Sequence, residues 1–91
     1  MRRRNMTEHW NVLVIDDEPV VRDAVERVLA EDGFRVAKAA DGASGVVHPA
    51  VATCRLVLLD LMLPDRSGLD VLRALRTARP DLPVVVITGY A

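Results

Sequence analysis

The sequence predicts an α/β fold in which helices cover an open, doubly wound parallel β-sheet. Short apolar runs alternate with helical stretches along the 91 residues, as in repeated strand–helix–strand crossovers. Residues 12–15, 56–59 and 84–87 are entirely apolar, which is typical of strands buried on both faces of a parallel sheet. Residues 34–38 alternate between apolar and polar or small side chains and predict an edge strand with one wetter face.

Helical spacing marks the segment after the first strand. Pro19 suits the first turn of a helix, and Gly33 is placed to end it. The apolar stripe of this helix is expected to comprise Val20, Val21, Ala24, Val25, Val28 and Leu29. A second, short or broken helix is expected after Asp41, because Gly45 and Pro49 interrupt it.

The helix after the third strand has clear boundaries. Ser67 can cap its start, and Asp70 stands three residues later, as in a capping box. Pro80 is expected to end the helix. The buried stripe is expected to consist of three leucines, Leu69, Leu72 and Leu75.

Composition and charge exclude several classes of protein. The net charge of −1 gives no electrostatic reason to expect a nucleic acid or an anionic membrane as a direct partner. Cys54 is the only cysteine, so no intrachain disulfide can form, and no apolar run is long enough to span a bilayer. We therefore expect a cytoplasmic protein. Residues 1–10 are interpreted as a basic, solvated tail, with a nucleic-acid arm as the alternative.

Polar residues follow three of the predicted strands. Asp16 and Asp17 follow the first, Asp60 the third and Thr88 the fourth. The carboxyl ends of parallel strands meet at one edge of a sheet, so these side chains are expected to converge there. Each alone would also suit a helix cap or a turn. Together, three repelling carboxylates suggest a site for Mg²⁺, which prefers oxygen ligands, and phosphoryl chemistry with an aspartate nucleophile.

Three segments resemble the receiver domains of response regulators. Residues 12–19 resemble the first strand and its acidic pair, residues 58–68 the phospho-acceptor segment, and residues 86–91 the fourth strand with its switch hydroxyl. The resemblance therefore extends from residue 12 to the last residue. It implies a receiver domain over residues 11–91 with a flavodoxin-like fold and strand order 2-1-3-4.

The resemblance also implies roles for individual residues. Asp60 would accept a phosphoryl group from a histidine of a sensor kinase or phosphotransfer protein. Asp17 and Asp60 would bind Mg²⁺ directly, Asp16 mainly through water, and Met62 through its backbone carbonyl. Thr88 would turn inward to bond the phosphoryl oxygens. The implied function is a signalling switch in a two-component system, and not that of an enzyme.

The sequence departs from the family pattern after the fourth strand. The family's fifth strand, its last two helices and a phosphoryl-binding lysine would fall beyond Ala91, and Lys38 is the only lysine in the chain. We therefore expect an incomplete domain. The edge of Val84–Ile87 would then be uncovered, which predicts instability, aggregation or a homodimer formed through this edge.

Two alternatives remain open at this stage. A degenerate receiver that serves only as a docking or dimerisation module is favoured by the unmatched lysine and disfavoured by the intact acidic residues. A phosphatase-like or dehalogenase-like enzyme could also use Asp60 as its nucleophile. Such enzymes commonly have a second acid two residues later, where this chain has Met62.

Overall fold

The computed structural model describes residues 10–87 and contains one parallel sheet within them. Its strands are β1 (Val12–Ile15), β2 (Val36–Ala39), β3 (Leu56–Asp60) and β4 (Val84–Ile87). The strand order is β2-β1-β3-β4, and every neighbouring pair is parallel. Both the predicted α/β class and the predicted strand order are confirmed.

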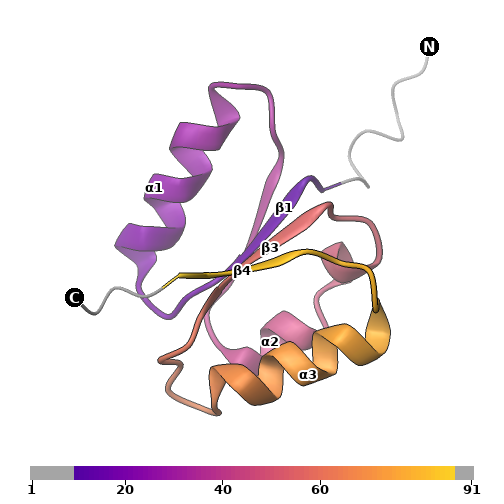
Figure 1. The fold of residues 1–91 in the computed structure, drawn as a ribbon. Helices are drawn as coiled ribbons and strands as arrows, with labels where there is room; N and C mark the ends of the chain where they lie inside the picture. Colours follow the sequence, from indigo (N-terminus) through magenta and orange to yellow (C-terminus); the bar gives the residue numbers. More distant parts are fainter. Residues whose placement is uncertain (1–9, 88–91) are drawn as a thin grey trace.

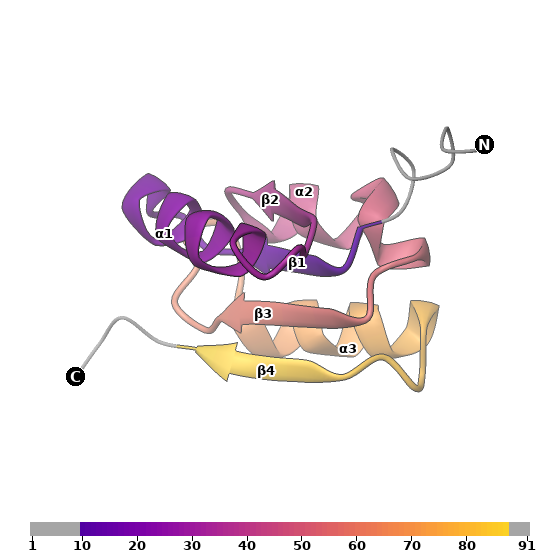
Figure 2. The ribbon, with the colours of Figure 1, turned by 90° about the horizontal axis from the view of Figure 1, so that it is seen from above.

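Helices cover the two faces of the sheet unequally. They are α1 (Pro19–Ala30), α2 (Gly42–Val46), the 3₁₀ turn η2 (Pro49–Ala52) and α3 (Gly68–Ala78). One face carries α1 and the other carries α2 and α3 (Figure 1). Seen from above, α1 lies by β1 and β2, whereas α3 lies by β3 and β4 (Figure 2). Within residues 10–87, the part of the sheet formed by β3 and β4 is therefore covered mainly on the face of α3.

The two faces contain two separate apolar clusters. Side chains alternate along a strand, so Leu13 and Ile15 point to the face of α2 and α3, while Val12 and Val14 point to the face of α1. All four are buried, as the uninterrupted apolar run predicted. The cluster beneath α2 and α3 is the larger and contains the fully buried Leu59 and Leu75.

The second strand starts later than predicted, and the second helix is short, as predicted. β2 begins at Val36, two residues later than predicted, and Phe34 before it is exposed. Lys38 is the exposed residue of this edge strand. The segment after β2 is broken into α2 and η2, and the Asp41 side chain caps α2 by accepting a hydrogen bond from the Ser44 N–H at 2.8 Å.

The predicted buried stripe of α3 was partly wrong. Leu75 is buried and Leu72 is half-buried, but Leu69 is 53% exposed and Val71 takes its place in the core. Val71 and Leu75 are four residues apart and share one helix face. Leu69 is two steps of three residues from Leu75, and because a helical turn has 3.6 residues, its side chain points away from that face. Ser67 caps α3, as predicted.

Among the described residues, Asp70 does not complete the predicted capping box with Ser67. Its carboxylate accepts a hydrogen bond from Arg73 at 3.1 Å, and both side chains are exposed. An exposed pair at this spacing contributes little to stability. The start of α3 is therefore held by Ser67, whose hydroxyl accepts from the Leu69 N–H at 3.1 Å.

The predicted stripe of α1 is also less buried than expected. Val20 and Val28 are 78% and 61% exposed, and no residue of α1 is fully buried. The helix contacts β1 and β2, and only its inner residues such as Val25 and Leu29 pack on their apolar cluster. An apolar groove of about 320 Å³ remains between α1 and β3, lined by Ala24, Val25, Val28, Leu29 and Leu58.

The revised stripe of α3 gives a direct test of the core. Replacing the buried Leu75 with alanine should lower the free energy of unfolding by about 2–5 kcal/mol, because it leaves a cavity under the sheet. The same substitution at the exposed Leu69 should change it by only about 0.5 kcal/mol. Urea unfolding of both variants measures the difference. Equal losses would contradict the observed orientation of α3.

Candidate functional site

Three carboxylates converge at the carboxyl ends of β1 and β3. Asp16, Asp17 and Asp60 each offer an oxygen atom, and these three atoms lie within 4.8 Å of one another. The sheet register produces this arrangement. Ile15 pairs with Leu59, so the residues that follow them, Asp16 and Asp60, come next to each other where the apolar strands end.

Asp16 is held firmly by its surroundings. Only 3% of its surface is exposed, and its carboxylate accepts a hydrogen bond from the Glu18 N–H at 2.9 Å. Its own N–H donates to the Ala39 carbonyl at 3.1 Å and so extends the β1–β2 pairing by one bond. Arg22 of α1 donates to the Asp16 carbonyl oxygen at 2.7 Å. The first residue after β1 is therefore fixed through both its backbone and its side chain.

The environment raises the pKa of Asp16 above its usual value of 3.8. Burial is the largest cause, and the nearby Asp60 and Asp17 raise the pKa further. The hydrogen bond from the Glu18 N–H and the charge of Arg22 act in the opposite direction but do not cancel the effect. The protein alone therefore does not fully balance the negative charge that it gathers here.

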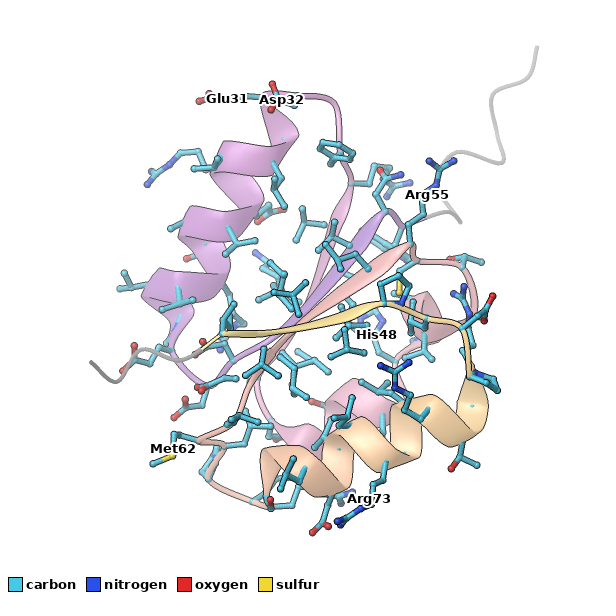
Figure 3. The ribbon with its side chains drawn as sticks, viewed as in Figure 1. Glu31, Asp32, His48, Arg55, Met62 and Arg73 are labelled. Carbon is cyan, nitrogen blue, oxygen red and sulfur yellow. The ribbon has the colours of Figure 1, made fainter. Side chains whose placement is uncertain are left out.

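Asp60 is the last residue of β3, and its side chain bonds to the backbone of the loop that follows. The side chain is 5% exposed and accepts a hydrogen bond from the Met62 N–H at 3.0 Å. The loop closes where Gly68 donates to the Leu61 carbonyl at 3.2 Å. A Cβ on Gly68 would lie 2.5 Å from the Leu61 Cα, so the loop requires glycine there. The Met62 side chain is 66% exposed and points outward (Figure 3).

The donor atoms of this cluster fit Mg²⁺. All three are carboxylate oxygens, and no imidazole or thiolate joins the group in the part of the chain that the structure describes. Hard oxygen donors are the ligands that Mg²⁺ prefers, and it commonly retains several waters. Asp17 is exposed and leaves one side of the cluster open to solvent. Burial is the main cause of the raised pKa of Asp16, and a divalent cation would relieve the repulsion from Asp60 and Asp17 that raises it further.

The structure brings three of the predicted site residues together and reveals others. Thr88 lies outside the described residues, although Ile87 before it pairs with Asp60. Arg22 contacts the site but has no motif of its own in the sequence. Asp65, also not predicted, joins the loop after Asp60 to α2. Both act through contacts that depend on how separate elements pack.

The sequence matches the family model of the response regulator receiver domain over residues 12–91, and the chain belongs to this family. It is 46% identical over 87 residues to the probable transcriptional regulatory protein TcrX of Mycobacterium tuberculosis. It is 40% identical over 78 residues to the transcriptional regulatory protein DltR of Streptococcus agalactiae. These matches cover 96% and 86% of the chain, which spans 37% and 35% of those two relatives.

Solved structures agree with this assignment. The response regulator TrrA of Thermotoga maritima, in complex with Mg²⁺ and BeF, has a TM-score of 0.81 and 30% identity, with 90% of this chain and 71% of that chain covered. TrrA in complex with the histidine kinase ThkA has a TM-score of 0.80, with the same identity and coverage. The chain is thus a receiver domain of the two-component type. Among residues 10–87, no helix has the length and apolarity needed to cross a membrane.

The raised pKa of Asp16 predicts how stability depends on pH in metal-free protein. The folded state binds the Asp16 proton more tightly than the unfolded chain does, so this contribution is complete below pH 3.8. It is lost as the pH rises through the raised pKa. Asp16→Asn keeps an oxygen for the Glu18 N–H without the charge, so it should stabilise the chain at neutral pH but not in acid.

Urea unfolding of the wild-type protein and the Asp16→Asn variant, in the presence of a chelator and from below pH 3.8 to neutral pH, measures the difference in their free energies of unfolding. Asp23→Asn is a suitable control, since it removes an exposed carboxylate that pairs with Lys38 and does not belong to the cluster. A stabilisation by Asp16→Asn that is unchanged in acid would show that the charge of the buried Asp16 is not its cause.

Proposed function

We propose that residues 11–91 form a phosphoryl-accepting receiver in which Asp60 is the phosphorylated residue. The observation that carries this proposal is the convergence of Asp16, Asp17 and Asp60 at one end of the sheet in a chain of the receiver family. Asp60 belongs to the interior strand β3, between β1 and β4, and is fixed by the Met62 N–H. These features suit a nucleophile held in one position.

The proposed reaction is a transfer of a phosphoryl group from a phosphohistidine. A carboxylate oxygen of Asp60 attacks the phosphorus, a P–O bond forms and the P–N bond breaks. The bonding pair returns to the nitrogen of the histidine ring, and Asp60 becomes an acyl phosphate. A hydrogen bond from the Met62 N–H orients the Asp60 carboxylate before attack.

The acidic cluster is proposed to hold Mg²⁺ during this transfer. Asp17 and Asp60 would bind it directly, Asp16 through water and Met62 through its carbonyl. When bound, the ion would neutralise charge on the transferring phosphoryl group. The solved TrrA complex with Mg²⁺ and BeF supports this for a related receiver. Thr88, which follows the Asp60 partner Ile87, is proposed to bond the phosphoryl oxygens.

The partner is proposed to be a sensor histidine kinase or a phosphotransfer protein in the cytoplasm. Support comes from the solved complex of TrrA with the histidine kinase ThkA. On this proposal the chain is a signalling switch and not an enzyme, since Asp60 is consumed and must be dephosphorylated before it can react again. Met62 stands where a phosphatase of the aspartate-nucleophile type would need its second acid.

Replacing the proposed nucleophile tests this function. In the presence of Mg²⁺ and a small phosphodonor, the wild-type chain should gain one acid-labile phosphoryl group, detected by intact mass. Asp60→Asn should gain none, because an amide cannot form the acyl phosphate. Chelation of Mg²⁺ should suppress labelling of the wild type by at least tenfold, or about 1.4 kcal/mol.

Asp70→Asn provides the matched control, since Asp70 is an exposed acid on α3 that pairs with Arg73. It should be labelled like the wild type. Absence of labelling in the wild type would favour a docking module, whereas repeated turnover of an organic phosphate would favour a phosphatase.

A second proposal concerns self-association through β4. This strand lies at the edge of the described sheet and consists of Val84, Val85, Val86 and Ile87, with no charge or proline to discourage pairing. Val85 and Val86 are 47% and 46% exposed. An unguarded apolar edge invites pairing with another strand. We propose that two copies of this chain associate through it.

A charge on this edge should oppose association. Val86→Lys should shift the chain toward monomer, because pairing would bring the charge of each copy against an apolar strand. Sedimentation equilibrium over a range of concentrations measures the change. Val47→Lys is the control, since Val47 is 76% exposed at the end of α2. A wild-type chain that remains monomeric at every concentration would contradict the proposed dimer.

A further inference from the structure

The loop between β3 and α3 is fastened to α2 by the carboxylate of Asp65. One oxygen accepts a hydrogen bond from the Gly42 N–H at 2.9 Å, and the other accepts from the Ala43 N–H at 2.8 Å. These two N–H groups belong to the first turn of α2, where backbone donors have no partner within the helix. A single side chain thus joins segments that are 22 and 23 residues apart in the sequence.

Packing around this contact leaves little room for movement. A Cβ on Gly42 would lie 2.6 Å from the Arg66 Cγ and 2.8 Å from the Val71 Cγ2, so α2 begins directly against the loop and α3. The Arg66 Nε lies 3.5 Å from an Asp65 oxygen. The hydrogen bond from Gly42, assisted by that from Ala43, lowers the pKa of Asp65. Asp65 is therefore ionised at neutral pH and accepts both bonds.

The Asp65 contact links the part of the acidic site that contains Asp60 with the part that contains Asp16. The loop starts at Asp60, whose carboxylate accepts from the Met62 N–H, and continues to Asp65. From Asp65 the connection passes to the start of α2, just after β2, and the last residue of β2, Ala39, accepts from the Asp16 N–H. Release of Asp65 would leave the outer part of the loop without its tie to α2.

We propose that Asp65 is a positioning residue of the phosphoryl-accepting site. Its carboxylate fixes the loop after Asp60 and thereby holds the Met62 carbonyl in place as a ligand for Mg²⁺. The role in metal binding rests on the proposed function. The role in fixing the loop does not, because it can be measured in metal-free protein.

Asp41 supplies a matched control for the simpler role of a helix cap. Its side chain accepts from the Ser44 N–H at 2.8 Å and so caps the same short helix through a hydrogen bond that does not involve the loop after Asp60. Asp41→Ala should weaken α2 but leave the loop fixed. Asp65→Ala should release both. The comparison therefore separates a positioning residue from one that only stabilises α2.

The first measurement is amide hydrogen exchange in metal-free protein. Asp65→Ala should speed exchange at Gly42, Ala43 and Met62, at Met62 by about fivefold, the factor that corresponds to one net hydrogen bond. Asp41→Ala should speed exchange at Ser44 and leave Met62 unchanged. If Asp65→Ala alters Gly42 and Ala43 but not Met62, Asp65 is only a cap and the proposal is overturned.

The second measurement is the Mg²⁺ concentration that gives half-maximal phosphorylation by a small phosphodonor. Asp65→Ala should raise it about tenfold, the lower end of the cost of removing an outer partner of a metal ligand. The maximal rate at saturating Mg²⁺ should fall much less, and Asp41→Ala should match the wild type. Equal half-saturating concentrations in the two alanine variants would overturn the proposal.

Asp65→Asn keeps the comparison decisive if Asp65→Ala fails to fold. The amide retains one acceptor oxygen for the two N–H groups. The exchange rate at Met62 and the half-saturating Mg²⁺ concentration should therefore lie between the wild-type values and those expected when the loop is released. Values identical to the wild type would count against the proposal. A wild-type chain that accepts no phosphoryl group would contradict the proposed function, whereas fixing of the loop by Asp65 is decided by hydrogen exchange alone.

Discussion

The parallel pairing of β1 with β3 is the constraint on which the rest of this structure depends. Ile15 lies opposite Leu59, and both are fully buried, so the register is held by apolar packing on the face of α2 and α3. A slip by one residue would turn every side chain of the strand to the other face. The same register puts Asp16 beside Asp60 just where the apolar strands end. The same strand pairing therefore buries the core and assembles the acidic site.

Gathering carboxylates at this point has an energetic cost that the protein offsets only in part. The N–H groups of Glu18 and Met62 and the guanidinium of Arg22 surround the cluster with positive ends of dipoles and one full charge. The pKa of Asp16 nevertheless remains raised. Burial is the main cause, and repulsion from Asp60 and Asp17 adds to it. A largely buried, mutually repelling group of carboxylates with an open side favours a divalent cation. The charge imbalance is therefore part of the proposed mechanism and not a defect of packing.

The two faces of the sheet contribute differently to this arrangement. The face of α2 and α3 contains the larger apolar cluster and both ends of the Asp65 contact, so the loop after Asp60 rests on the better packed side. The face of α1 has no fully buried helical residue and keeps an apolar groove beside Leu58. Regions with fewer buried contacts open more readily. The face of α1 is accordingly the less tightly packed side of the sheet.

The sequence by itself determined the strands, the helix caps and the acidic residues, whereas the tertiary structure decided which contacts join them. Uninterrupted apolar runs are typical of strands buried on both faces, and this prediction holds for β1 but not for β4, whose Val85 and Val86 are about half exposed. Ser67 and Asp41 cap their helices through bonds within three residues. The buried face of α3 was predicted less well, because periodicity does not say which side meets the sheet, and Val71 replaced Leu69. Arg22 and Asp65 could not be predicted. Their partners come from other elements, and an interaction such as that of Asp65 with α2, across more than 20 residues, leaves no local pattern.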